Sequence, residues 1–118
     1  ALAALAGAQG PLAAAIDNEI LGSQFNALLA LPEGGERQDQ GRALLAACEA
    51  LFARDRQPAY LWNALEVACR APLAASEIFR LCGVLGEHLG EARVRQRVLG
   101  EETYQAARAV FAAPAAVN

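Results

Sequence analysis

Lysine and methionine are absent from the chain, and histidine, tryptophan and tyrosine are scarce. The lack of lysine excludes a Schiff base and a lysine clamp on a phosphate group. We attribute the exclusive use of arginine to the coding bias of a GC-rich bacterial genome. Because position 1 is also not methionine, we expect a chain that has lost its initiator residue or is a piece of a longer protein.

Histidine chemistry has little support in the sequence. His88 is the single histidine, and the positions four residues before and after it are Val84 and Ala92. A zinc site needs three or four nitrogen, sulfur or oxygen ligands, and a di-iron bundle needs Glu-x-x-His pairs on two helices. Nucleophile elbows, phosphate loops and dinucleotide fingerprints are absent as well. The sequence therefore predicts no enzyme, no metal and no cofactor, and an exposed His88 near a helix end.

The cysteines and the N-terminal residues give no sign of export. Cys48, Cys69 and Cys82 are odd in number, and their spacing matches no metal or redox motif. The first residues, ALAALAGAQGPLAAAI, lack a basic region and contain Gln9, Gly10 and Pro11. We expect a reduced, cytoplasmic protein with three buried thiols and no membrane contact.

The composition is that of one globular domain spanning residues 1–118. Hydrophobic residues make up 55% of the chain and charged residues 19%, which excludes disorder by composition. The net charge of −3 offers no overall attraction for nucleic acid or anionic lipid.

Apolar residues recur with a helical period, which predicts an all-α, compact bundle of four to five helices. Expected helices cover about residues 11–31, 41–54, 58–70, 73–89 and 91–113, with a short turn over residues 1–8. The fourth helix has Ser76 as an alternative N-cap, the fifth a weak point at Gly100 and an end at Pro114. The segment PEGGERQDQG, residues 32–41, is expected to be a mobile loop, or a hinge that lets the first helix dock on a second copy.

The segment QPAYLWNALEVACRAP contains the most apolar of these helices. Its polar residues Asn63, Glu66 and Arg70 form one narrow line, so we expect the 58–70 helix to be central and surrounded by other helices. Glu66 and Arg70 are spaced for an ion pair. The spacing of Tyr60 and Trp62 favours packing in different directions over a shared ligand site. Tyr60, Trp62 and His88 are nonetheless the candidates for ligand or partner contact.

Three functional hypotheses remain open. The first is a non-enzymatic bacterial interaction module, such as an adaptor, chaperone-like or regulatory subunit, that binds a protein partner or forms a homodimer. The second is a DNA-binding regulator with a helix-turn-helix variant in residues 58–110 and a turn at Gly83. Its candidate nucleic-acid contacts are Arg93, Arg95 and Arg97, of which Arg93 and Arg97 share a helix face. The third is a helical bundle that binds a small molecule.

Overall fold

Over the residues that the structure describes, all regular secondary structure is helical, which confirms the predicted all-α class. The computed structural model describes residues 11–111, with side chains from residue 17 onward. In chain order its elements are α2 (Pro11–Ala30), α3 (Gly35–Asp55), α4 (Pro58–Arg70), α5 (Ala75–Leu89), α6 (Glu91–Gly100) and the 3₁₀ segment η1 (Glu102–Ala107). The turn expected over residues 1–8 and the helix end expected at Ala113 and Pro114 lie outside the described residues.

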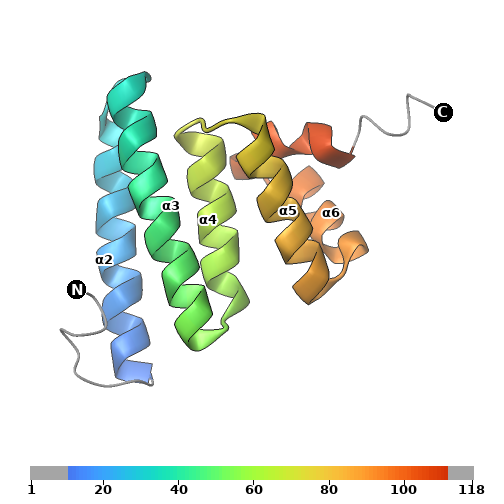
Figure 1. Cartoon of the computed structure of the whole chain (residues 1–118), viewed down its shortest axis with the longest axis horizontal. Coiled ribbons are helices and arrows are strands. Elements are labelled where there is room, and N and C mark those ends of the chain that lie inside the picture. The colour runs from blue at the N-terminus through green and yellow to red at the C-terminus, as the bar shows by residue number, and fades with distance from the viewer. Residues whose placement is uncertain (1–10, 112–118) are drawn as a thin grey trace.

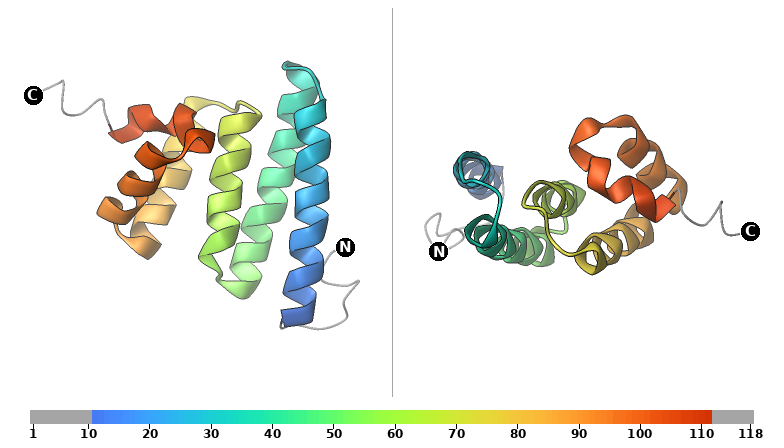
Figure 2. Two further views of the ribbon diagram at one scale, coloured as in Figure 1. Left: turned by 180° about the vertical axis from the view of Figure 1, so that it is seen from behind. Right: turned by 90° about the horizontal axis from the view of Figure 1, so that it is seen from above.

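The helices are arranged in two layers. The connections between α2, α3, α4, α5 and α6 are short, so each helix runs antiparallel to the next (Figure 1). Seen along the helices, α2, α4 and η1 lie on one side, and α3 and α5 lie on the other (Figure 2). Contacts follow this zigzag, and α4 touches α3, α5 and η1.

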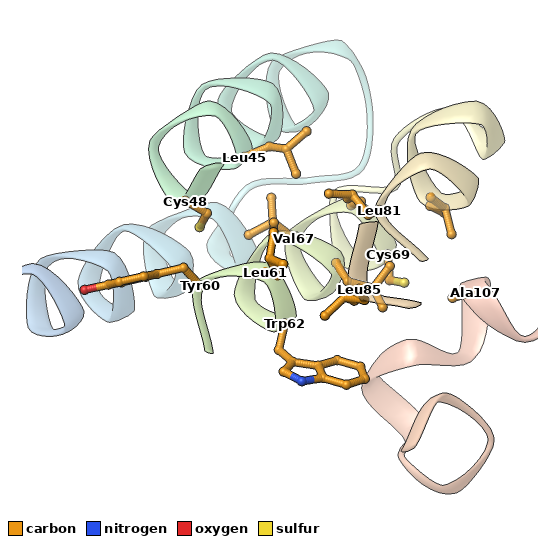
Figure 3. Close-up of a cluster of buried hydrophobic side chains, with 14 of the residues drawn as sticks. Leu45, Cys48, Tyr60, Leu61, Trp62, Val67, Cys69, Leu81, Leu85 and Ala107 are labelled. Atoms are coloured by element: carbon orange, nitrogen blue, oxygen red, sulfur yellow. The ribbon is translucent and has the colours of Figure 1, made fainter. Parts of the chain in front are cut away.

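The helix α4 occupies the centre of the fold, as its sequence predicts. Pro58 begins it, where the missing N–H would have no helical partner, and its last residue, Arg70, precedes Pro72 by two positions. Side chains around most of its circumference are buried, namely Tyr60, Leu61, Trp62, Ala64, Leu65, Val67, Ala68 and Cys69. They meet apolar residues from the flanking helices (Figure 3).

The expected loop over residues 32–41 is wrong for most of its length. Helix α3 begins at Gly35, so only a short turn separates it from α2. The Arg37 guanidinium donates hydrogen bonds to the carbonyl oxygens of Leu31 and Arg70, and the Gln38 amide donates to that of Pro72. These carbonyls lie at or just beyond the ends of α2 and α4, where helices leave acceptors unpaired. Two polar residues of the expected loop, Arg37 and Gln38, therefore tie three segments together.

Gly41 lies inside α3 and lets it approach the end of α4 closely. A β-carbon at this position would be 2.4 Å from the β-carbon of Ala71, far inside van der Waals contact. Gly41 is thus a packing residue within a helix, not the end of a loop.

The C-terminal half has one unexpected helix start and one expected break. Helix α5 begins at Ala75 with Ala74 at the N-cap, so the expected cap at Ser76 is wrong. The expected fifth helix stops at Gly100, and Glu101 is extended with φ −114° and ψ 131° before η1 begins. The weak point predicted at Gly100 is confirmed.

A cluster of charged and polar groups joins α2 to the start of α4 through α3. Arg54 donates to the carboxylate of Asp17 at 2.6 Å and to that of Asp55 at 2.6 Å, and the Asp17 side chain is fully buried. The Tyr60 hydroxyl lies 3.5 Å from Asp55 and donates to it. The hydrogen bond from Arg54 holds the pKa of the Asp55 carboxyl below its usual range.

We expect Gly41→Ala to destabilise the fold by about 1–3 kcal/mol, because the new methyl group collides with Ala71. The matched control is Gly83→Ala in α5, where a β-carbon meets nothing within 4 Å. Better helix propensity should stabilise that variant by about 0.5–1 kcal/mol. Urea unfolding followed by circular dichroism measures both, and a Gly41→Ala chain as stable as the wild type would contradict the close contact.

The Asp55 cluster should make stability depend on pH. Since the folded-state pKa of Asp55 is lowered, its contribution is complete above the unfolded-state pKa near 4 and is lost as the pH falls through the folded-state value. Asp55→Asn should therefore be less stable than the wild type near neutral pH, and the difference in melting temperature should shrink below about pH 4. Thermal melts at several pH values test this, and a difference that is constant with pH would contradict it.

Candidate functional site

The polar line of α4 lies on the face of this helix between α2 and η1. Asn63 and Glu66 are half-buried and Arg70 is exposed. The Thr103 hydroxyl in η1 donates a hydrogen bond to the Glu66 carboxylate at 2.8 Å. The same hydroxyl accepts a hydrogen bond from the Arg70 guanidinium at 3.5 Å. The ion pair expected between Glu66 and Arg70 is therefore replaced, within residues 17–111, by contacts of both side chains with Thr103.

A groove of about 270 Å³ lies on the other side of this line, between α2 and α4 with α3 as its floor. We call it the α2–α4 groove. Its residues come from all three helices and are Asn18, Leu21, Gly22, Phe25, Leu44, Cys48, Asn63, Glu66 and Val67. Most of these side chains are apolar, and the polar ones are two amides and one carboxylate.

The α2–α4 groove combines apolar walls with three polar side chains. Each of the amides of Asn18 and Asn63 offers two donors and an acceptor, while the Glu66 carboxylate accepts only. A few convergent polar groups on apolar walls are the usual composition of ligand and partner sites. The groove can therefore take an apolar side chain and align a polar group beside it.

Tyr60 and Trp62, two of the sequence-based candidates, point away from each other as predicted (Figure 3). Their exposed fractions are 2% and 7%. The Tyr60 hydroxyl reaches Asp55, and burial is the main cause that raises its pKa. Neither side chain contributes to the α2–α4 groove.

Trp62 instead lies against residues from the C-terminal half of the chain. Its ring centre is 5.3 Å from that of Tyr104 in η1, and the Arg97 guanidinium lies 4.3 Å from the indole centre. Burial raises the pKa of Tyr104 to about 12. The structure thus joins Trp62 and Arg97, which the sequence assigned to separate hypotheses.

The three candidate arginines of α6 divide as predicted. Arg93 and Arg97 line one hollow, whereas Arg95 is exposed away from it. The proposed turn at Gly83 is wrong, because α5 continues through it from Ala75 to Leu89. That version of the helix-turn-helix hypothesis therefore does not describe the chain.

His88 is exposed in the last turn of α5, as predicted, where a cation suits the helix dipole. Its ring meets that of Phe52 edge to face, with centres 4.9 Å apart. In the described part of the chain no group of three or more His, Cys, Asp or Glu residues could hold a metal ion. None of its helices has the length and apolar character needed to cross a membrane.

All three cysteines are buried and free, which confirms the predicted burial of the thiols. Burial raises the pKa of Cys48 to about 12, and of Cys69 and Cys82 to about 11. Because the thiolate is the reactive form, these values oppose a nucleophilic or redox role.

The α2–α4 groove was not foreseen from the sequence. The line of Asn63 and Glu66 on an otherwise apolar helix was a usable signal, but it resembles an ordinary solvated stripe. That Asn18 and Phe25 meet this line depends on how α2 and α4 pack on α3. No local pattern encodes that arrangement.

Comparisons with known proteins add nothing to this geometry. No family model matches it, and no curated protein and no solved structure is significantly similar to it. The groove, the burial pattern and the charges therefore carry the functional argument.

We expect the three thiols to be alkylated at least about 100-fold more slowly than a free cysteine at pH 8, because their thiolate fraction is so small. Mass spectrometry after iodoacetamide treatment measures the rate for each site, and the urea-unfolded chain is the control that should react normally. A thiol that reacts at the free rate in the folded chain would contradict its burial.

Proposed function

We propose that the chain is a non-enzymatic protein-interaction module that works as a two-fold homodimer. In this arrangement the α2–α4 groove of each copy receives the flank of α2 that contains Phe25 from the other copy. The observation that carries the proposal is the groove itself, in which apolar walls lie beside the amides of Asn18 and Asn63 and the carboxylate of Glu66.

The edge position of α2 supports this proposal. Helix α2 packs mainly on α3, and over residues 17–30 its buried side chains are those of Asp17, Leu21 and Leu28. Phe25 remains only partly buried although it is large and apolar. A second hollow, of about 480 Å³, lies between α2 and α3. An edge helix with partly covered apolar side chains on its flanks is the kind of surface that usually meets another protein.

The residues of this flank suit self-association. In a two-fold interface the same patch appears on both sides, so a ridge must lie next to a matching depression. Phe25 provides the ridge, and Gly22, one turn earlier, provides an open position where a β-carbon would meet nothing within 4 Å. The amides of Asn18 and Asn63 suit the same symmetry, because an amide pairs well with another amide.

The arginines of α6 support a role in nucleic-acid binding less well than the groove supports protein interaction. Arg97 is already stacked on Trp62 and paired with Glu101 at 2.9 Å. The net charge of −3 adds repulsion from a phosphate backbone. A module that assembles or regulates other proteins agrees better with these features.

We expect the wild-type chain to dimerise at micromolar concentrations and Gly22→Glu to weaken the dimer at least about tenfold, because a charged side chain would fill the apolar groove. The matched control is Gly83→Glu, the same change at an open glycine of α5. Sedimentation velocity over a concentration series measures the dimer constant of each variant.

A wild-type chain that stays monomeric over this range would overturn the homodimer. So would a Gly83→Glu variant that dissociates while Gly22→Glu remains a dimer, because this would place the interface on α5. Circular dichroism of all three proteins separates loss of association from loss of folding.

A further inference from the structure

The hollow beside Trp62 is separate from the α2–α4 groove and uses different elements. Its volume is about 470 Å³, and its residues are Pro58, Trp62, Leu89, Arg93, Gln96 and Arg97. Apolar groups from α4 and α5 form one wall, and polar groups from α6 form the other. The site therefore combines a hydrophobic surface with two guanidinium groups.

Arg97 is held in a fixed orientation at this site. Its guanidinium lies 4.3 Å from the centre of the Trp62 ring and 5.7 Å from that of Tyr104, and its Nε donates to Glu101 at 2.9 Å. Stacking on aromatic rings orients the guanidinium plane and leaves its outer N–H groups free to bind a second acceptor. The contact with Glu101 shows that a carboxylate fits against this arginine.

Arg93 gives the hollow an excess of positive charge. It lies one turn before Arg97 on α6 and is exposed, and it forms no salt bridge within residues 17–111. The lining of the hollow thus contains two guanidinium groups and no carboxylate, and of the two only Arg97 is paired with an acidic residue of the described chain, Glu101. This local surplus occurs on a chain whose net charge is −3.

We propose that this hollow binds a carboxylate attached to an apolar body, as in an acidic peptide segment of a partner protein. The carboxylate bridges Arg93 and Arg97 through charge-assisted hydrogen bonds, with the Gln96 amide as a further donor. The neighbouring apolar side chain packs against Pro58, Trp62 and Leu89. The site does not involve the α2–α4 groove, so it is independent of the homodimer.

A peptide fits the hollow better than a nucleic acid does. A phosphate backbone requires several cations along its path, but Arg95 lies outside the hollow and Arg97 already has an acidic partner. Exposed carboxylates at Glu91 and Glu101 on either end of α6 would repel further phosphates. A single carboxylate carries one charge, so it meets less of this repulsion, and its apolar body can use the apolar wall.

The fluorescence of Trp62 tests the proposal directly, because it is the only tryptophan in the chain. The probe is a capped peptide of alternating leucine and glutamate, and its control has glutamine in place of glutamate. A glutamine peptide with a free C-terminal carboxylate shows whether the ligand group belongs to a side chain or a chain end. We expect the carboxylate-bearing peptides to shift the emission saturably, with an affinity that falls as salt rises.

Arginine variants identify the binding groups. Arg93→Gln should weaken the peptide at least about tenfold, since it removes one charge-assisted contact while leaving the stack of Arg97 on Trp62 in place. Arg95→Gln, an equal change in charge on the same helix, should bind like the wild type. Unchanged circular dichroism confirms that both variants are folded.

Three results would overturn the proposal. The first is a neutral capped peptide that binds as well as the acidic one, and the second is Arg93→Gln binding with wild-type affinity. The third is a single-stranded oligonucleotide that binds more tightly than any carboxylate peptide, which would favour the nucleic-acid hypothesis. Each readout is independent of dimerisation, so failure here leaves the proposed homodimer to its own test.

Discussion

The burial of α4 on almost every side is the constraint from which the rest of the structure follows. A helix with Leu65 and Ala68 fully buried must have neighbours on several faces, and α3, α5 and η1 provide them. Beyond its first turn, only the polar line of α4 remains accessible to solvent. This line separates the surface next to α2 from the surface next to η1. The two surfaces proposed for binding lie on either side of this helix.

Elements with a local signal were predictable from the sequence. Proline bounded α4, Gly100 marked the break after α6, and the helical period of the apolar residues indicated an all-α class. The error over residues 32–41 has a physical cause: Arg37 and Gln38 read as loop residues but bind carbonyls more than thirty positions away. Long-range hydrogen bonds of this kind leave no trace in a local window.

The candidate sites were predictable only in part, and for the same reason. Trp62 and the pair Arg93 and Arg97 were identified separately, because each stands out in composition or in helix spacing. Their meeting depends on the angle between α4 and α6, which tertiary packing determines. Phe25 gave no distinctive signal, since a single aromatic residue on an amphipathic helix is usually part of the core.

The peripheral position of α2 gives the fold an uneven resistance to opening. This helix packs mainly on α3, to which the buried carboxylate of Asp17 binds through Arg54. Helix α4, in contrast, is in contact with three elements. Amide protons of α2 can therefore exchange with solvent through a local detachment that leaves the remaining helices intact. Amide protons of α4 exchange only when the whole domain unfolds. The fold thus consists of a peripheral helix that can unfold locally and a core that unfolds only globally.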